Sequence, residues 1–144
     1  MTLHALEFNH NEVIPRKFTC QGKDINPALK IEHIPPRTKA LVLIVDDPDA
    51  PMGTWVHWVV FNIPPDTKKI SEDSVPGIQG INDFKRTSYG GPCPPSGSHR
   101  YFFKLYALDK RLDLTVGAGK EDLLRAMEDS VLDYTELIGT YEKK

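Results

Sequence analysis

This chain of 144 residues lacks a large excess of positive or negative charge: 18 Lys and Arg face 20 Asp and Glu, for a formal net charge of −2. It therefore has no basic stripe to follow a nucleic-acid backbone and no polybasic arm for a membrane surface. Long apolar runs are missing too, since no stretch approaches the ~20 residues of a membrane span. Residues 1–7 lack the charged and apolar regions of a signal peptide. We therefore expect a cytoplasmic protein with no membrane span and no nucleic-acid partner.

Cysteine is equally scarce, with only Cys20 and Cys93 in the whole chain. The two thiols form neither a C-x-x-C motif nor a zinc-ribbon pattern. A reducing compartment would keep both free, so we expect reduced thiols. The alternative of a disulfide between them is kept, because sequence separation does not limit spatial distance. A phosphate-binding P-loop is also missing, which argues against nucleotide hydrolysis of the Walker type.

Proline, in contrast, is abundant, with 12 prolines against 10 glycines, and most fall between apolar runs. Proline cannot donate to a sheet ladder, so this spacing indicates breaks between strands. Three strong strands are predicted, over residues 39–47, 55–63 and 99–108. Both faces of the first two are apolar, as in central strands. Weaker strands are expected at residues 18–19, 29–32, 112–114 and 134–141.

One helix is predicted over residues 120–132. Apolar residues recur there at helical spacing from Leu123 to Val131, and Glu121 and Asp122 occupy the first turn, where acidic groups suit the helix dipole. Many strands with one main helix near the C-terminus predict an all-β fold of two antiparallel sheets. No internal repeat or low-complexity linker divides the chain, so residues 1–144 are expected to form a single domain.

Short polar side chains gather where the strong strands begin or end. Asp47 ends the first strand and Asp49 follows it, His57 lies early in the second, and the third opens with His99 and Tyr101. Successive strand residues point to opposite faces, so His99 and Tyr101 share a face. If the strands lie side by side, these five side chains share one cavity.

The same alternation turns neighbouring polar residues away from that cavity. Asp46 leaves the first strand on the face opposite to Asp47. Ser98 and Arg100 point away from His99, so Arg100 is expected to pair with an acid or to cover the sheet. Ser98 is then poorly placed to act as a nucleophile with His99 as its base.

The five side chains predict a small anion site. Carboxylates beside imidazoles raise the pKa of histidine and favour the cation. Two cationic imidazoles, a tyrosine hydroxyl and backbone N–H groups of the glycine-rich segment would bind phosphate, sulfate or a carboxylate. Taken singly, His57 and His99 would more often be core residues, and Asp47 and Asp49 turn formers. Their combination favours a site.

Two segments carry a specific pattern: Asp47-Pro-Asp-Ala-Pro51 followed by His57, and Gly97-Ser-His-Arg-Tyr101. Together they resemble the phosphatidylethanolamine-binding protein family, also called the Raf kinase inhibitor protein family. Three further segments resemble its bacterial and archaeal branch: residues 19–22, 89–95 and 137–141. The resemblance covers residues 7–142, which is nearly the whole chain.

This resemblance implies two antiparallel sheets with Greek-key connections and a pocket for a small anion or a phosphorylated ligand. The pocket residues of the family carry over to Asp47, Asp49, His57, His99 and Tyr101, with Pro51 shaping the wall. It further implies binding without catalysis and without a metal or other cofactor. A regulatory or inhibitory role is implied as well, with a kinase or a protease as the protein target, and the prokaryotic branch is expected to form homodimers.

Two other functions are weighed against this one. Asp47, Asp49, His57 and His99 could hold zinc or manganese in a metal-dependent hydrolase, although the chain lacks the close His-x-His or His-x-x-x-His spacing that would strengthen this hypothesis. The chain could instead inhibit a protein through the long glycine- and proline-rich passage of residues 65–97, without using the pocket.

Overall fold

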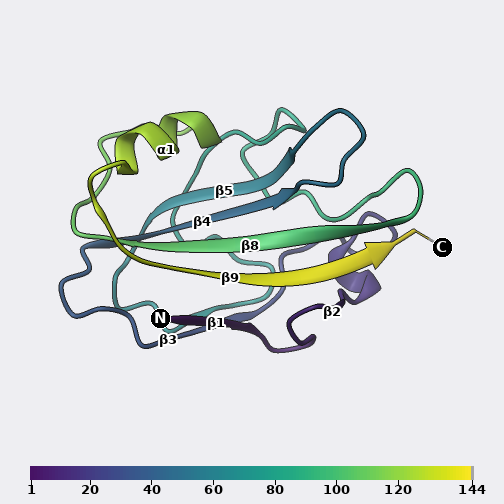
Figure 1. Ribbon diagram of the computed structural model, residues 1–144, viewed down its shortest axis with the longest axis horizontal. Helices are drawn as coiled ribbons and strands as arrows, with labels where there is room; N and C mark the ends of the chain where they lie inside the picture. The colour runs from purple at the N-terminus through teal and green to yellow at the C-terminus, as the bar shows by residue number, and fades with distance from the viewer. Residues whose placement is uncertain (144) are drawn as a thin grey trace.

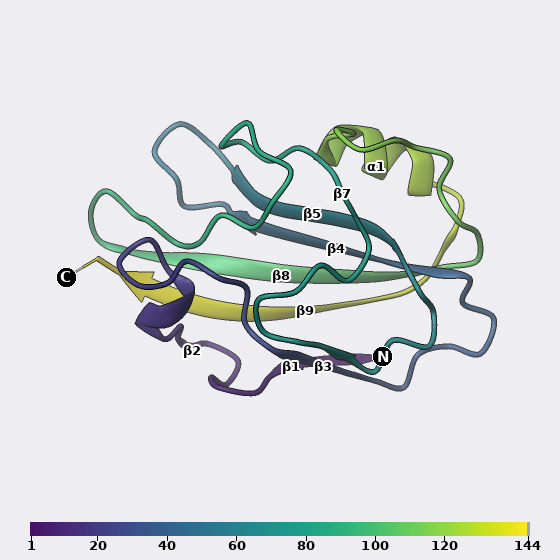
Figure 2. The ribbon, with the colours of Figure 1, turned by 180° about the vertical axis from the view of Figure 1, so that it is seen from behind.

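The computed structural model describes residues 1–143 and shows two β-sheets packed face to face, with one helix on the outer side (Figure 1, Figure 2). The smaller sheet has the strand order β1 (Thr2–Ala5), β3 (Leu29–Glu32) and β6 (Lys69–Ile70). The larger sheet has the order β2 (Glu12–Val13), β9 (Val131–Glu142), β8 (Ser98–Leu108), β4 (Ala40–Asp47), β5 (Trp55–Ile63) and β7 (Ile78–Gln79). The helices are the 3-10 helix η1 (Arg16–Phe18) and the α-helix α1 (Lys120–Met127).

The larger sheet contains a Greek key. Strands β4, β5 and β7 lie side by side in this sheet, with β6 of the smaller sheet between β5 and β7 in the chain, and β8 then returns to pair with the other side of β4. This spatial order, with the fourth strand beside the first, defines the motif. The predicted all-β fold with two sheets and one main helix is confirmed. The one departure from antiparallel pairing among residues 1–143 is β2, which runs parallel to β9.

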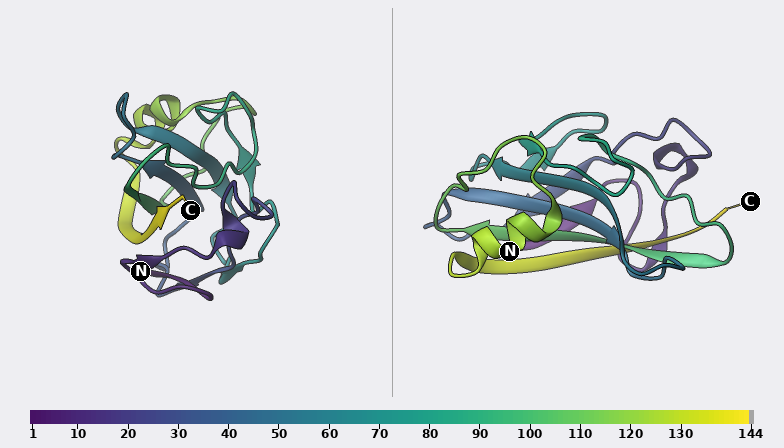
Figure 3. Two further views of the ribbon diagram at one scale, coloured as in Figure 1. Left: turned by 90° about the vertical axis from the view of Figure 1, so that its right-hand side faces the viewer. Right: turned by 90° about the horizontal axis from the view of Figure 1, so that it is seen from above.

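Strand β4 lies between β5 and β8 in the centre of the larger sheet and is buried on both faces, because the smaller sheet covers one face and α1 the other. Leu41, Leu43 and Val45 pack toward the smaller sheet. Val42 and Ile44 pack toward α1. Figure 3 shows these layers from two further sides, with α1 against the larger sheet. Each large apolar side chain buried in this way contributes about 1.5–3 kcal/mol, which is why the strand is a continuous apolar run.

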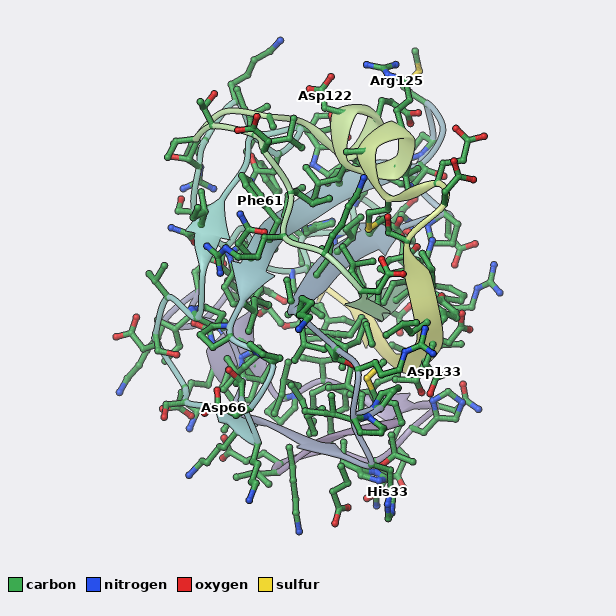
Figure 4. All side chains as sticks on the ribbon, turned by 90° about the vertical axis from the view of Figure 1, so that its left-hand side faces the viewer. His33, Phe61, Asp66, Asp122, Arg125 and Asp133 are labelled. Atoms are coloured by element: carbon green, nitrogen blue, oxygen red, sulfur yellow. A yellow bond between two sulfur atoms is a disulfide. The ribbon has the colours of Figure 1, made fainter. Side chains whose placement is uncertain are left out.

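Helix α1 ends at Met127, although the apolar spacing predicted a helix over residues 120–132. The Ser130 N–H turns back to the Met127 carbonyl at 2.8 Å, and Val131 already pairs with β8. The sheet ladder therefore takes residues that the spacing assigned to the helix. Figure 4 shows Asp122 on the side of the helix that faces away from the sheet.

Two of the weaker strand predictions are wrong. Phe18 ends η1, and the N–H of the next residue, Thr19, caps that helix by donating to the Arg16 carbonyl, so residues 18–19 form no strand. Residues 112–114 form no strand because the Asn62 side chain pairs with the Leu112 backbone. Its Oδ1 accepts the Leu112 N–H at 2.8 Å, and its Nδ2 donates to the Leu112 carbonyl at 2.9 Å. The strands predicted at residues 29–32 and 134–141 are confirmed as β3 and as part of β9.

A β-bulge in β5 sets the direction of His57. Val45 of β4 pairs with Trp58, but the next residue of β4, Asp46, pairs with Val56. His57 is therefore an extra residue in the ladder. Val56 packs toward α1, whereas Trp58 belongs to the core between the sheets and the His57 ring contacts a member of that core. Bulges re-aim side chains in this way, and this one turns His57 toward the inner side of the larger sheet.

Candidate functional site

The end of β4 and the starts of β5 and β8 meet at one end of the larger sheet, at the right in Figure 1. Residues there line a pocket of ≈ 250 Å³. Asp47 closes β4, His57 lies on β5, and His99 and Tyr101 lie on β8; all four line the pocket. Because β4 runs between the other two strands, the carboxylate stands on the strand between the two histidines. The structure thus brings together four of the five polar residues predicted for the cavity.

The Asp47 carboxylate has two neighbours that use both of its oxygens. Its Oδ2 lies 2.7 Å from Nδ1 of His99, and its Oδ1 accepts the backbone N–H of Asp49 at 2.8 Å. Asp47 and His99 are only 3% and 7% exposed. An ionised carboxylate accepts and does not donate, so Nδ1 of His99 carries the hydrogen of this bond. Nε2 of His99 is then the nitrogen available to a ligand in the pocket.

His57 is held by backbone and not by a carboxylate. Its Nδ1 lies 2.7 Å from the Gly90 carbonyl oxygen, to which it donates, and the Gly90 N–H donates to the His57 carbonyl at 3.1 Å. Burial lowers the pKa of His57 below its ordinary value, and it outweighs the Gly90 carbonyl and the Asp47 charge, which act in the opposite direction. The expectation of two cationic imidazoles is therefore wrong for His57, which is neutral near pH 7 and presents Nε2 as an acceptor.

Tyr101 contributes a buried hydroxyl with no hydrogen-bond partner among residues 1–143. The hydroxyl approaches the backbone of Cys93 without the geometry of a hydrogen bond. Its ring packs edge-on against His57 with centroids 5.2 Å apart. Burial, and after it the Asp47 charge, raises the pKa of Tyr101, so the hydroxyl keeps its proton. Leaving such a donor unpaired costs free energy, so a ligand oxygen that reached this hydroxyl would gain a hydrogen bond.

Asp49 does not line the pocket, although the sequence predicted that it would. Its carboxylate accepts three hydrogen bonds from Arg100, each at 2.9 Å. The guanidinium donates Nε–H to Oδ2 and Nη2–H to Oδ1, and the backbone N–H of Arg100 donates to Oδ2. The hydrogen bonds from Arg100 lower the pKa of Asp49 to about 2. The predicted pairing of Arg100 with an acid is confirmed. Asp49 thus ties the loop after β4 to the start of β8.

The walls of the pocket are apolar. Pro51 lines the cavity, as predicted for the wall, and the other apolar lining residues are Ala50, Met52, Trp55, Phe84, Pro94 and Pro95. The sequence patterns did not single out Phe84, whose ring lies edge-on to His57 with centroids 5.3 Å apart. Nothing in the spacing of residues 65–97 marks Phe84, because the loop reaches the pocket only through the fold.

Cys93 completes the wall, and it is joined to Cys20 by a disulfide. The expectation of two reduced thiols is therefore wrong for this structure. The two residues are 73 positions apart in the sequence, but their Cα atoms are only 5.4 Å apart. The fold brings them together because the segment after Gly90 crosses the loop that follows η1, where the Cys20 N–H donates to the Pro92 carbonyl at 3.1 Å.

The carboxylates of Asp46 and Asp49, near the pocket, pair with basic side chains. Among residues 1–143, no group of three or more His, Cys, Asp or Glu side chains is arranged to hold a metal ion. Asp49 faces Arg100, and Asp46 lies on the opposite face of β4, where Lys104 and Lys120 both donate to its Oδ2 at 3.0 and 2.9 Å. The metal-dependent hydrolase hypothesis therefore gains no geometric support.

This fold and pocket place the chain among two-sheet β-proteins that open a small cavity at one end of the larger sheet. The family model for phosphatidylethanolamine-binding proteins matches residues 4–142, so the chain belongs to that family, as its two motifs predicted. It is 54% identical to a UPF0098 protein of Pyrococcus horikoshii, with 95% of this chain and 74% of that protein covered. It is 50% identical to a UPF0098 protein of Methanothermobacter thermautotrophicus, with 99% of each covered.

Two crystal structures share the fold over nearly the whole chain. A protein of Chlamydia trachomatis described as a homolog of phosphatidylethanolamine-binding proteins is 41% identical, with a TM-score of 0.96 over 99% of this chain and 97% of that one. Escherichia coli YbcL, described as a member of the mammalian family, is 28% identical, with a TM-score of 0.91 over 99% of this chain and 98% of that one. No helix in residues 1–143 is long and apolar enough to cross a membrane.

Proposed function

We propose that the pocket binds a small anion, namely phosphate, sulfate or the phosphate group of a larger ligand, and catalyses no reaction on it. One observation carries this proposal. Two imidazoles whose Nδ1 atoms are already held, His57 and His99, meet the unpaired hydroxyl of Tyr101 in one cavity. These three groups are oriented by the protein but not satisfied by it, as binding groups must be before a ligand arrives.

The three groups play different parts in this proposal. The Tyr101 hydroxyl donates to an anion oxygen. Neutral His57 takes up a proton when the anion arrives, because a nearby negative charge favours the imidazolium. His99 is oriented by its bond to Asp47 and turns Nε2 to the ligand. Ser98, the serine adjacent to His99 in the sequence, is exposed and does not line the cavity. It is therefore not placed to act as a nucleophile there, which supports binding over catalysis.

Isothermal titration of the protein with sodium sulfate, together with NMR of the imidazole resonances, tests the proposal. We expect binding that shifts the resonances of His57 and His99, and loss of binding in His99→Ala. His4→Ala is the matched control, because His4 is exposed on β1 of the other sheet and should bind normally. Absence of binding at millimolar sulfate with unmoved imidazole resonances refutes the proposal.

We further propose that the pocket serves a regulatory or inhibitory role toward a protein target, a kinase or a protease. The rim supports this idea, since Met52 is 95% exposed and Trp55 37% exposed at the pocket mouth. Phe84 belongs to the long passage of residues 65–97 and lines the same pocket, so that passage and the pocket form one surface. His99→Ala should abolish inhibition; retained inhibition would assign it to the 65–97 passage alone.

We also propose a cytoplasmic homodimer. The edge strands of the larger sheet, β2 and β7, are two residues long each, and such short edges resist edge-to-edge pairing. Part of its outer face remains open, where Tyr134 is 38% exposed and packs against Tyr106. Half-buried Phe102 and Ile138 pair further along the same face, beyond Lys104 and Glu136. A two-fold contact through this face would bury it. Light scattering should give twice the chain mass, and Tyr134→Lys should give a monomer; a monomeric unsubstituted protein contradicts this.

A further inference from the structure

The Cys20–Cys93 disulfide connects the pocket wall to a distant part of the chain. Cys93 lines the cavity, whereas Cys20 follows η1 and is exposed to solvent. A bond that a reductant can reach from outside therefore ends inside the proposed binding site. In a cytoplasmic protein such bonds are usually transient and are used in catalysis or redox sensing.

The segment of residues 90–95, named here the wall segment, shapes the pocket in two ways. Its first residue, Gly90, accepts the Nδ1–H of His57 and so orients that imidazole. Its last residues, Pro94 and Pro95, line the cavity beside Cys93. A displacement of residues 93–95 would change the width of the cavity and the surroundings of His57, which lines it with them.

Up to Cys93, the chain is well tied to residues 18–24. The Tyr89 hydroxyl donates to a carbonyl of that stretch at 2.7 Å, the Gly91 N–H to a carboxylate at 2.7 Å, and the Pro92 carbonyl accepts an N–H at 3.1 Å. These bonds hold the first half of the wall segment whether or not the disulfide is present.

After Cys93 these hydrogen bonds to residues 18–24 end. Residues 94–97 take part in no hydrogen bond identified within residues 1–143, and two of them, Pro94 and Pro95, have no N–H to donate. The ladder with β9 resumes only at Ser98. The disulfide is therefore the last attachment before the stretch of wall that faces the ligand.

We propose that the Cys20–Cys93 disulfide is a redox switch for anion binding, with the oxidised form holding the wall in the binding geometry and the reduced form releasing it. This rests on the pocket binding an anion, as proposed above. One thiolate of a dithiol reductant attacks the sulfur of Cys20, the S–S bond breaks, and Cys93 leaves as a thiolate that takes a proton from water. The second thiol of the reductant then attacks the mixed disulfide and releases Cys20 as a thiol. Two electrons and two protons pass to the protein, and the reductant becomes a disulfide.

The test compares sulfate titrations of the oxidised protein and of the protein reduced with dithiothreitol, with complete reduction verified by mass spectrometry. We expect sulfate affinity to fall by at least about fivefold on reduction, the lower end of typical coupling between two linked sites. The double variant Cys20→Ser, Cys93→Ser should bind as weakly as the reduced protein and should not respond to dithiothreitol. Equal affinities of the two redox forms overturn the proposal, as does a disulfide that dithiothreitol opens only in denaturant.

A second variant separates a switch from general loosening. Tyr89→Phe removes one hydrogen bond between the same two parts of the chain but keeps the disulfide. It should bind sulfate like the unsubstituted protein; a loss equal to that of the double variant would overturn the specific role of the disulfide. Circular dichroism at 25 °C shows whether each form is folded. If the double variant is unfolded, the reduced protein alone decides.

The redox proposal and the proposed function can fail separately. If the oxidised protein binds no sulfate, the proposed function is refuted. The effect of the disulfide on the pocket is then decided by the imidazole resonances of His57 and His99, recorded before and after reduction. A shift of the His57 resonance supports control of the pocket wall by the disulfide, and unmoved resonances overturn it.

Discussion

Nδ1 of His99 lies 2.7 Å from Oδ2 of Asp47, and both side chains are buried although each is able to carry a charge. The bond satisfies two polar groups that would otherwise be costly inside the protein. It also selects the tautomer of the imidazole and turns the second ring nitrogen to the pocket. One contact therefore links the stability of the fold to the direction of a ligand-binding atom.

Asp47→Ala should lose both stability and binding. Removing one partner of a buried, hydrogen-bonded pair costs about 3–5 kcal/mol, and the imidazole loses its orientation. Urea unfolding and sulfate titration measure the two effects. The matched control is Asp46→Ala, since Asp46 is equally buried but faces Lys104 and Lys120 on the other side of the sheet. It should lose stability and retain sulfate binding; a loss of binding in both variants would show that unfolding alone explains the result.

Tyr101→Phe should weaken sulfate binding without lowering stability. The variant removes a buried hydroxyl that has no partner among residues 1–143, so the free energy of unfolding should stay the same or rise by about 1 kcal/mol. Sulfate affinity should fall about tenfold, because a lost hydrogen bond to a charged group is worth about 1.5 kcal/mol. Thermal unfolding and calorimetric titration measure the pair. Unchanged sulfate affinity would identify Tyr101 as a core residue only.

The pH dependence of stability should show the buried His57. Burial lowers its pKa from the ordinary value of 6.5, so below that pH the unfolded chain binds more protons than the folded one. The contribution of His57 is therefore complete above pH 6.5 and is lost as the pH falls through the lowered pKa, at up to about 1.4 kcal/mol per pH unit. The difference between the unsubstituted protein and His57→Gln, measured by urea unfolding at several pH values, isolates this slope. Parallel curves for the two proteins would contradict it.

Sulfate binding should strengthen as the pH falls. The bound anion favours the protonated form of His57, so binding takes up a proton and the affinity rises by up to about tenfold per pH unit above the pKa of the free site. Sulfate keeps its charge throughout the neutral range, so the slope reports on the protein. Titrations between about pH 8 and pH 6 check it, with His57→Gln as the variant whose affinity should no longer vary. A flat profile for the unsubstituted protein means that His57 stays neutral with the ligand bound.

Reduction of the Cys20–Cys93 disulfide should destabilise the fold. Crosslinking residues 73 positions apart removes entropy from the unfolded chain, which corresponds to about 4 kcal/mol. Urea unfolding with and without dithiothreitol measures the change, and the double variant Cys20→Ser, Cys93→Ser controls for the reagent. A loss below about 1 kcal/mol would show that the hydrogen bonds around Gly91 and Pro92 hold the junction without it.

Much of the candidate site follows from strand patterns. The apolar run that became β4 ended at Asp47, and the one in β5 followed His57. Alternation along β8 correctly placed His99 and Tyr101 together and Arg100 away. Alternation succeeds there because β8 is regular from its first residue through Ala107, where its pairing with β9 shifts. It could not place His57, whose direction depends on a bulge in the pairing of β5 with β4.

The all-β architecture, the central strands and the family could be predicted from the amino-acid sequence, because these depend on local periodicity and on two short motifs. Three contacts emerge only from the folded chain: Asp49 pairs with Arg100, the Gly90 carbonyl accepts from His57, and Cys20 is bonded to Cys93. Each of these contacts joins segments distant in the chain. Such contacts depend on strand register and on the paths of loops, and no periodicity within either segment records them.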